Sequence, residues 1–351
     1  MISLTTANIT DYLRETGRIE STEAVVVREL SGGVSNTVLL VERSSQERNF
    51  VLKQALPRLK VQQEWLCSIE RIWREVEVLR ICGDLLKSSS DDESAFSRTS
   101  VKVAVPQVLF EDRENYLYAM TAAPAEHQTW KEMLLAGEID LQVATACSNL
   151  LGRLHAGSWH DPQIAQQLED RTFFDDLRLA PYYRRLMEVY PDLRSILEEL
   201  IAATWNTRLS LVHGDFSPKN LLVSPDQLML IDFEVGHFGD PAFDLGFFLT
   251  HLTLKGFLDG SFRTSPLFQA ITTFWEAYWL HLLPVASSAE LVALQARACQ
   301  HWSACLLARV DGKSPVDYLT PELQQTIRQT ARALLVQPAS TISRQMRRME
   351  A

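Results

Sequence analysis

A short segment with a β-strand pattern interrupts the long helical stretch in the second part of the sequence. This β-island is the feature that most restricts the folds open to the chain. Residues 210–233 read as strands, whereas long helical patterns occupy most of the chain after residue 122. Before residue 122 the sequence predicts several short strands and one inserted helix. A length of 351 residues suits about two domains. We therefore predict an α+β fold with a β-rich N-terminal lobe, residues 1–122, and a larger helical C-terminal lobe, residues 123–351.

Hydrophobic periodicity predicts the individual elements of both lobes. Strands are expected at residues 24–30, 37–42, 50–53, 107–110 and 116–121, and helices of the first lobe at residues 8–16 and 69–86. Helices of the second lobe are expected at residues 141–156, 181–188, 193–204, 266–283, 289–309 and 321–335. Residues 88–100 are polar and of low complexity, which predicts a loop.

Composition excludes several classes of partner. Lys and Arg total 34 against 44 Asp and Glu, and the net charge of −10 argues against a general nucleic-acid binder. No stretch approaches the ~20 apolar residues of a membrane span, and residues 1–20 lack the apolar segment of a secretory signal. The five cysteines show neither disulfide-framework nor zinc-site spacing. We expect a cytoplasmic protein without nucleic-acid or membrane partners, and the sequence leaves its oligomeric state open.

The island carries the residues that indicate chemistry, HGDFSPKN at 213–220 and IDFE at 231–234. Asp215 is followed five residues later by Asn220, and Asp232 comes twelve residues after that. A strand–loop–strand hairpin would bring the three together. Phosphoryl transfer needs such a set: one carboxylate orients the attacking hydroxyl and accepts its proton, and amide and carboxylate oxygens hold Mg²⁺ against the phosphates. The alternative is an ordinary Asx-rich hairpin, and the combined order and spacing favour catalysis.

These motifs resemble those of the aminoglycoside phosphotransferase/choline kinase-like family, over roughly residues 20–310. The resemblance implies a two-lobed, protein-kinase-like fold that binds ATP and Mg²⁺ in the cleft and a small molecule on the helical lobe. It also implies that Asp215 is the catalytic base and that Asn220 and Asp232 are magnesium ligands. Glu234 matches a variable second acid of the family, and a surface or hinge role is the alternative.

The same resemblance implies a lysine–glutamate pair in the first lobe. Lys53 ends the third expected strand, where its ammonium would reach the ATP phosphates; an exposed strand-end lysine is the alternative. Its partner lies on the next helix, where Glu75 leads, Glu77 is second and Glu70 is a further candidate.

Two backbone segments are expected to contact the nucleotide. The turn at residues 31–36 lies where a phosphate-covering loop belongs, and Gly32, Gly33 and Ser35 would contact phosphates there; an ordinary hairpin turn is equally compatible. Residues 118–123 are expected to pass the adenine, with Met120 and Ala122 as cofactor-binding residues; a plain linker between the lobes fits the same placement.

The segment after Asp232 and two histidines give further information about the type of kinase and the support of the catalytic loop. Phe243 comes only eleven residues after Asp232, which leaves too little room for the activation segment of a protein kinase. Asp244 is expected to cap a helix or brace the catalytic loop, and His213 and His155 are interpreted as hydrogen-bonded scaffold residues.

The sequence says less about the molecule that would accept the phosphoryl group. Residues 53–57 with Trp65, and the D-x-E form of IDFE, resemble methylthioribose kinases, which phosphorylate a neutral thiosugar, although Asn220 stands where those enzymes typically carry a smaller residue. We favour a small metabolite or sugar of that type as acceptor. Aminoglycoside or choline-type phosphotransferases and a non-catalytic nucleotide-binding module are the alternatives.

Specific acceptor contacts are also left open. An aromatic cage for a cationic acceptor would draw on Trp275, Glu276, Tyr278, Trp279 and Trp302, but aromatic residues at helical spacing are more often core. Arg309 and the pair Arg347–Arg348 are further candidates, with surface or tail charges as the alternative interpretation.

Overall fold

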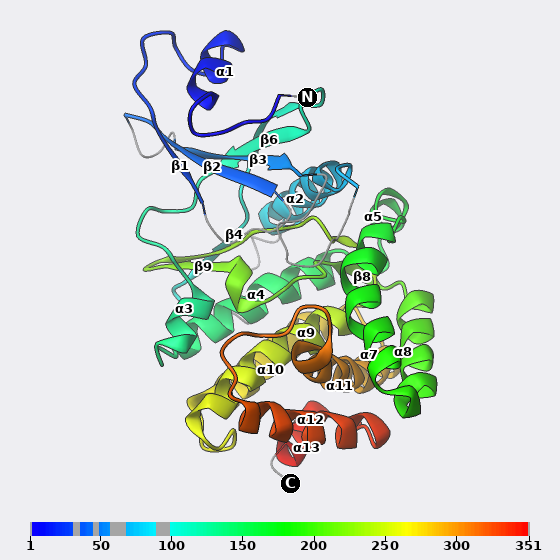
Figure 1. The fold of residues 1–351 in the computed structure, drawn as a ribbon. Coiled ribbons are helices and arrows are strands. Elements are labelled where there is room, and N and C mark those ends of the chain that lie inside the picture. The colour runs from blue at the N-terminus through cyan, green and yellow to red at the C-terminus, as the bar shows by residue number, and fades with distance from the viewer. Residues whose placement is uncertain (1, 31–35, 45–48, 57–67, 89–98, 350–351) are drawn as a thin grey trace.

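The computed structural model describes residues 2–30, 36–44, 49–56, 68–88 and 99–349. The chain forms a smaller upper part built on a β-sheet and a larger helical part below it (Figure 1). Among the described residues, no helix is both long and apolar enough to cross a membrane. The described cysteines, at 82, 147, 299 and 305, are buried thiols without disulfide bonds, and Cys67 lies outside the described residues.

A five-stranded antiparallel sheet forms the N-terminal part, in the order β1-β2-β3-β6-β5. Its strands are β1 (Val26–Glu29), β2 (Asn36–Glu42), β3 (Phe50–Ala55), β5 (Val108–Asp112) and β6 (Leu117–Thr121). Each strand overlaps an expected strand, so the β-rich prediction for this lobe is confirmed.

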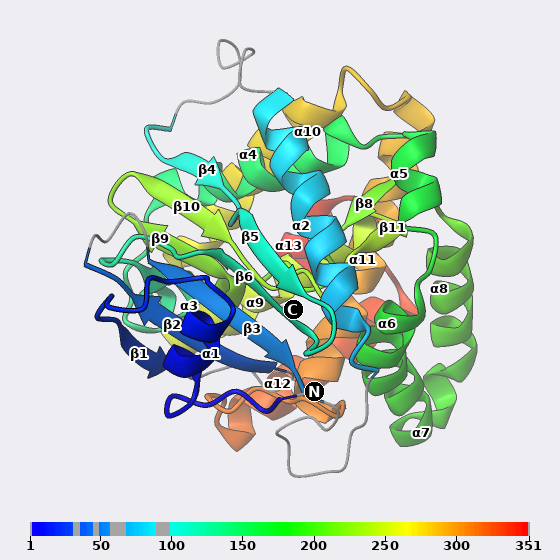
Figure 2. The same ribbon diagram turned by 90° about the horizontal axis from the view of Figure 1, so that it is seen from above.

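The two faces of this sheet are covered differently because side chains alternate along a strand. Phe50 and Leu52 of β3 join a small core with α1 (Ile9–Glu15), which lies over the sheet in Figure 2. Val51 of β3 faces the other way and joins the main core. Lys53 shares the face of Val51, which directs its side chain toward α2 and the helical part.

Helix α2 (Arg71–Ser88) is the long helix of the N-terminal part and crosses beneath the sheet (Figures 1 and 2). Its buried positions recur every three or four residues and include Ile72, Val76 and Leu79. Glu75 lies on this buried face, whereas the Glu77 side chain is 43% exposed and forms an ion pair with Arg74. The helical period thus separates two glutamates that are close in sequence.

The β-island forms two small sheets at the top of the helical part. One has the order β4-β10-β9-β7 and the other pairs β11 with β8. Their strands are β4 (Lys102–Ala104), β7 (Gln128–Thr129), β8 (Ser210–Val212), β9 (Leu221–Ser224), β10 (Gln227–Leu230) and β11 (His237–Gly239). β4 precedes residue 122 yet pairs in parallel with β10, so one strand from the first third joins a sheet of the helical part. The lobe boundary at residue 122 stays a prediction.

Helices make up most of the chain after β6, in agreement with the predicted α+β class. They are α3 (Trp130–Leu135), α4 (Leu141–Gly157), α5 (Pro162–Gln167), α6 (Thr172–Phe174), a π-helix (Asp175–Arg184), α7 (Arg185–Val189), α8 (Arg194–Asn206), α9 (Ala242–Gly256), α10 (Pro266–Leu282), α11 (Ser288–Asp311), α12 (Pro321–Val336) and α13 (Ile342–Arg348). Short 3₁₀ turns lie at Pro191–Leu193, Pro218–Asn220 and Phe257–Asp259.

The predicted start of a helix at Pro181 is wrong. Pro181 lies inside the π-helix Asp175–Arg184, and the helical path already begins at Thr172. Proline normally marks the first turn because it cannot donate a backbone hydrogen bond. The wider π-helical turn departs from the ordinary i→i−4 pattern, and such turns occur frequently at functional sites.

Two histidines buried in the helical part predict how stability depends on pH. Burial lowers the pKa of His237 and of His301 to about 4, whereas an unfolded histidine titrates near 6.5. Between these values the unfolded chain binds more protons, so stability is full above pH 6.5 and falls progressively as pH drops toward 4. Each histidine contributes roughly 3 kcal/mol to this loss. We expect unfolding midpoints measured from pH 7.5 to 4.5 to fall steeply below pH 6.5.

His301→Gln tests the origin of this slope. His301 contacts the Tyr183 hydroxyl at 2.6 Å and the Thr204 hydroxyl at 3.1 Å, and a glutamine amide retains polar atoms for these partners without titrating. The variant should show a shallower decline below pH 6.5, while His160→Gln, at an exposed histidine, should match the wild type. An unchanged slope in His301→Gln contradicts the assignment.

Candidate active site

Three charged side chains meet where β3, α2 and the segment after β10 converge. The Lys53 ammonium lies 2.6 Å from Glu75 Oε1 and 3.1 Å from Asp232 Oδ1. Glu75 Oε1 also accepts a hydrogen bond from the Phe233 backbone N–H at 3.2 Å. The structure thus pairs Lys53 with Glu75, not with Glu77 or Glu70, and connects this pair to the IDFE motif.

In this cluster, burial and the neighbouring charges shift the pKa values of the side chains in opposite directions. Burial acts to lower the pKa of Lys53, but the Glu75 and Asp232 carboxylates outweigh it and hold that pKa well above its ordinary value. Burial raises the pKa of Glu75 despite the nearby Lys53. The pKa of Asp232 is held well below its usual range because Lys53 and Lys219 outweigh the effect of burial. Lys53 is therefore a cation and Asp232 an anion at neutral pH.

The catalytic-loop sequence places Asp215 among three nitrogen donors. Its Oδ2 lies 3.0 Å from Arg178 Nη2, 2.9 Å from Lys219 Nζ and 2.9 Å from Asn220 Nδ2. Burial acts to raise the pKa of Asp215, but Arg178 and Lys219 together lower it. Asp215 is thus an ionised acceptor oriented from three sides.

Arg178 is a site residue that sequence reasoning missed. It lies in the π-helix, 37 residues before Asp215, and no motif marks it. Its Nε donates to the Gly214 carbonyl at 2.6 Å, so one guanidinium holds both the loop backbone and the Asp215 carboxylate. The sequence held no signal for it, because the π-helical turn that contains Arg178 and Pro181 is visible only in the structure; such turns occur frequently at functional sites.

Unusual backbone conformations flank both aspartates. Asp232 has a φ of 73°, a left-handed conformation that only a small share of non-glycine residues adopt. Gly214 has a φ of 76°, and a Cβ there would lie 2.9 Å from Val235 Cγ1 and 3.2 Å from the Val235 carbonyl oxygen. Glycine is therefore required directly before Asp215, and the strained Asp232 is typical of a functional position.

A buried hydrogen-bond network centred on Asp244 holds the loop that carries Asp215. Asp244, in the first turn of α9, accepts hydrogen bonds from the backbone N–H groups of His213 and Gly214 at 2.7 and 2.8 Å. His155 Nε2 lies 3.3 Å from the same carboxylate, and Tyr278 OH lies 2.9 Å from His155 Nδ1. The expected bracing role of Asp244 and scaffold role of His155 are confirmed.

His213 is also a scaffold residue, and its tautomer follows from its partners. Nδ1 accepts a hydrogen bond from the Asp215 N–H at 3.1 Å, so Nε2 carries the proton and donates to the Ile231 carbonyl at 3.2 Å. Burial lowers the pKa of His213, in keeping with a neutral ring. Its ring thereby connects the Asp215 loop to the strand that leads to Asp232.

Glu234 connects the two lobes. Its Oε2 accepts from Arg71 Nε at 3.2 Å and from Asn36 Nδ2 at 3.4 Å, and all three side chains are buried. Arg71 begins α2 and Asn36 begins β2, so the hinge alternative for Glu234 has direct support, while its assignment as a second acid for the metal stays untested.

The expected nucleotide-contacting backbone is only partly described. Met120 lies within β6, opposite Val51 of β3, and the Ala122 N–H donates to the Asn49 carbonyl at 3.4 Å. Gly32, Gly33 and Ser35 lie outside the described residues, so their predicted phosphate contacts cannot be located. β1 and β2 on either side pair antiparallel, as a hairpin requires.

The donor atoms near Asp215 suit a hard divalent cation. The Asn220 amide nitrogen is engaged by Asp215, which leaves its carbonyl oxygen for a metal, and Asp232 supplies a carboxylate. In the described part of the chain no three His, Cys, Asp or Glu side chains form a metal cluster. Mg²⁺ does not need one, because it keeps several waters and takes one or two carboxylates together with substrate phosphates. Asn220 and Asp232 therefore fit Mg²⁺.

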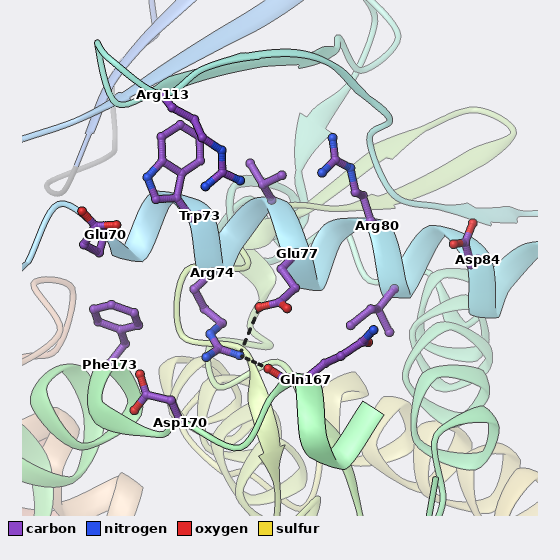
Figure 3. A pocket seen from close by; sticks show the side chains of 12 residues that line it. Glu70, Trp73, Arg74, Glu77, Arg80, Asp84, Arg113, Gln167, Asp170 and Phe173 are labelled. Atoms are coloured by element: carbon purple, nitrogen blue, oxygen red, sulfur yellow. Dashed lines mark hydrogen bonds and ion pairs between the residues drawn. The ribbon is translucent and has the colours of Figure 1, made fainter. Parts of the chain in front are cut away.

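A groove of about 670 Å³ lies along the other face of α2, away from these residues (Figure 3). Arg74 crosses it, with its guanidinium 3.5 Å from both Glu77 Oε2 and the Gln167 carbonyl (Figure 3). Trp73 and Arg113 stack at its edge, 4.6 Å apart. The groove contains none of the residues near Asp215, and Arg74 serves as a second link between α2 and the helical part.

The candidate acceptor residues separate into core and surface. Tyr278 and Trp302 are fully buried, whereas Trp275 and Trp279 are partly buried and Glu276 is exposed, so the five side chains do not share one environment. Arg347 is exposed on α13 at the far end of the helical part, away from the sheet. Arg309 is partly buried and donates to Tyr182 OH at 3.2 Å and to Ser314 Oγ at 3.0 Å, so it is not a plain surface charge.

Solved structures with the same architecture define the fold. Plasmodium vivax ethanolamine kinase matches 92% of this chain and 86% of its own with a TM-score of 0.54 at 12% identity. Choline kinase from Cryptosporidium parvum Iowa II matches 95% of this chain and 97% of its own with a TM-score of 0.52 at 12% identity. The fold is therefore the protein-kinase-like fold of small-molecule kinases, as the motifs predicted.

Sequence comparison narrows the class to a family. Methylthioribose kinases of Bacillus mycoides (strain KBAB4) and Bacillus cereus (strain B4264) are each 24% identical over 303 residues, which cover 79% of this chain and 72% of the relative. The sequence pattern of the phosphotransferase enzyme family matches residues 26–265, well over half of the chain. The chain belongs to this family and is an ATP-dependent phosphotransferase with an alcohol group as acceptor.

Proposed function

We propose that this chain transfers the γ-phosphoryl group of ATP, in the presence of Mg²⁺, to a hydroxyl of a small metabolite or sugar, with a methylthioribose-like sugar favoured. The observation that carries the proposal is the position of Asp215: it is ionised, oriented by three donors, and connected through Asn220 and His213 to the segment of Asp232. Phosphoryl transfer depends mainly on such positioning and on charge.

The contacts of Asp215, Lys53 and Glu75 support the roles proposed for them. Asp215 orients the acceptor hydroxyl and takes its proton. Lys53 positions the ATP phosphates, and Glu75 holds Lys53 in place through their 2.6 Å ion pair. Asn220 and Asp232 would hold Mg²⁺, which neutralises developing phosphate charge when bound. Met120 and Ala122 are proposed to contact the adenine, and Gly32, Gly33 and Ser35 the phosphates.

Arg178 adds a role that the sequence did not predict. It contacts Asp215 from the helical side, so it keeps the carboxylate ionised and directed toward the cleft. Lys219 neutralises the same carboxylate from within the loop and is half-exposed, so it is free to move toward a transferred phosphoryl group. We propose both as positioning residues for the transfer.

The preference for a sugar over a cation has two supports. The methylthioribose kinases align over 79% of this chain. Two of the aromatic side chains considered for binding choline or an aminoglycoside, Tyr278 and Trp302, are buried in the core, with Tyr278 hydrogen-bonded to His155 and Trp302 to Thr253.

Magnesium-dependent ADP release by the purified protein tests this function. The acceptor panel contains 5-methylthioribose, ribose, homoserine, choline, ethanolamine and two aminoglycosides, and Asp215→Ala is the blank. We expect stimulation by one neutral or acidic acceptor, absent in the blank and without magnesium. Stimulation by choline or an aminoglycoside alone favours the alternative acceptors, and ATP binding without transfer to any acceptor contradicts the proposed activity.

A further inference from the structure

One face of α9 leads from the loop that carries Asp215 to a group of basic side chains. Asp244, in the first turn, holds the loop, and Phe247, His251 and Lys255 follow on one side of the helix at intervals of three or four residues. At 1.5 Å per residue, His251 lies roughly 10 Å and Lys255 roughly 16 Å along the helix from Asp244. The two side chains therefore lie about two and three helical turns from Asp244.

Lys255 is an unusual residue for this position because it is buried without a counter-charge. Its side chain is only 2% exposed. Its ammonium donates to the His251 carbonyl at 3.3 Å and lies 5.2 Å from the centre of the Tyr318 ring. In the described part of the chain no carboxylate lies within ion-pair distance of it. Buried lysines are almost always paired with an acidic group, and Lys255 lacks such a counter-charge.

Further positive charges converge on the same place. Burial first, and then the charges of Lys131 and Arg309, lower the pKa of Lys255 to about 7. Burial and the charges of Arg309, Lys255, Lys219 and Lys131 lower the pKa of His251 well below its ordinary value. Neither Lys131 nor Arg309 forms an ion pair with any described carboxylate. Asp317, which acts on the neighbouring Tyr318, is exposed.

Three buried polar atoms of this group also lack partners. His251 Nε2, Arg309 Nε and the Tyr318 hydroxyl have no hydrogen bond among the described residues. His251 is buried, with an exposed fraction of 6%. A buried polar group without a partner typically costs about 1–3 kcal/mol, so three together with an unpaired lysine indicate a missing ligand.

A chain of contacts connects this group to Asp215. Arg178 contacts Asp215 at 3.0 Å and lies 5.7 Å from the centre of the Phe247 ring, and that ring lies 4.9 Å from the His251 ring. Tyr182 stacks on Phe247 at 5.9 Å and accepts a hydrogen bond from Arg309. The connection between α11 and α12, which contains Tyr318, passes across α9 in Figure 1.

We propose that Lys255, Arg309, His251 and Tyr318 form a subsite for an anionic group, carboxylate or phosphate, on the acceptor molecule. This inference rests on the proposed function and narrows its acceptor from any small sugar to one that carries an acid. The anion would neutralise Lys255 and Arg309 and would accept hydrogen bonds from the Tyr318 hydroxyl and from the unpaired nitrogens. The acceptor hydroxyl would then point along α9 toward the loop that carries Asp215.

A neutral or cationic acceptor fits this group less well. A neutral thiosugar would leave both cations without a counter-charge. A choline or aminoglycoside nitrogen would add a further positive charge at a buried site, which is unfavourable because like charges repel strongly where water is excluded. The acceptor is therefore expected to resemble a methylthioribose-type sugar in size and to differ from it in charge.

Matched acceptors that differ only in charge test the subsite. ADP release with MgATP is measured for glucose, glucosamine, glucuronate and glucose 6-phosphate, and for ribose, 5-methylthioribose and ribose 5-phosphate. We expect kcat/KM for an anionic member to exceed that of its neutral counterpart about 10-fold or more. Glucuronate and the sugar phosphates distinguish a carboxylate from a phosphate site.

Variants of Lys255 and Arg309 test whether these residues cause the preference for an anionic acceptor. Lys255→Met and Arg309→Met should each raise KM for the anionic acceptor about 10-fold or more and leave KM for ATP near the wild-type value. Lys102→Met and Arg347→Met, at exposed positions, are the matched controls. Lys255→Met removes an unpaired buried charge, so it should fold and have an unfolding temperature at least equal to that of the wild type.

A binding measurement keeps the test independent of turnover. With MgADP present, inorganic phosphate should raise the unfolding temperature of the wild type about 2 °C more than chloride at equal ionic strength. This difference should disappear in Lys255→Met and Arg309→Met and persist in both control variants. The proposed subsite is wrong if the phosphate-dependent difference is present in all variants or absent from the wild type.

The two proposals fail in different ways. If a neutral or cationic acceptor gives the highest kcat/KM and Asp215→Ala abolishes that turnover, the kinase activity stands and the anionic subsite is wrong. If no acceptor stimulates ADP release, the proposed function is contradicted, and the phosphate-dependent shift alone decides whether the cluster binds an anion.

Discussion

Asp215→Ala should lower kcat on the order of 10²- to 10⁴-fold, the range found when a positioned general base is removed. The residue is buried, ionised and within 3.0 Å of Arg178, Lys219 and Asn220, which orient its carboxylate. We propose that Lys53 and the opposite lobe contact the nucleotide instead. KM for ATP should therefore change little, as measured by ADP release at saturating acceptor.

Asp215→Asn separates the chemical role from the structural one. The amide keeps the volume and one acceptor oxygen for the surrounding nitrogens but cannot take a proton. We expect the same loss in kcat with a smaller change in stability than for Asp215→Ala. Asp226→Asn, on the exposed turn between β9 and β10, is the matched control and should retain wild-type turnover. Comparable turnover in Asp215→Asn and the wild type would refute the base assignment.

Asp244→Ala should lower the free energy of unfolding by about 3–5 kcal/mol, because it breaks a fully buried charged network. The backbone N–H groups of His213 and Gly214 would lose their acceptor, and His155 would lose its partner. Each orphaned buried donor costs about 1–3 kcal/mol. Urea unfolding followed by tryptophan fluorescence measures this loss.

The same substitution should also lower kcat, because the loop that carries Asp215 loses its attachment to α9. Asp244→Asn retains one acceptor oxygen and should lie between the wild type and Asp244→Ala in both stability and kcat. Asp84→Ala, at an exposed position on α2, is the control and should change unfolding by less than about 0.5 kcal/mol. Wild-type stability in Asp244→Ala would show that the network contributes nothing.

Much of the site follows from residues that are close in sequence. Asp215 and Asn220 are five residues apart in one loop, and the hairpin β9–β10 returns the chain to Asp232. Local geometry of this kind depends on turn length and strand pairing, both of which a sequence pattern encodes. The helical period of α2 explains the choice of Glu75 over Glu77, because the two lie on different faces.

Other contacts depend on which segments pack together over long distances. Arg178 reaches Asp215 from a π-helix 37 residues away, and Arg71 of α2 reaches Glu234 across 163 residues. No spacing rule connects such residues, because their separation depends on how whole elements are arranged. The same is true of Lys255 and Arg309, which lie on different helices and become a candidate subsite only through the packing of α9 against α11.

The sequence by itself determined the fold class, the five strands of the N-terminal sheet, most of the long helices and the aspartate–asparagine–aspartate motif of a phosphotransferase, because these depend on periodicity and short spacing. Only the tertiary structure decided that Arg178 holds Asp215, that Arg71 pairs with Glu234, and that Lys255 is buried without a counter-charge. The physical reason is that burial and charge partners arise when distant elements exclude water together, and no single segment carries that information.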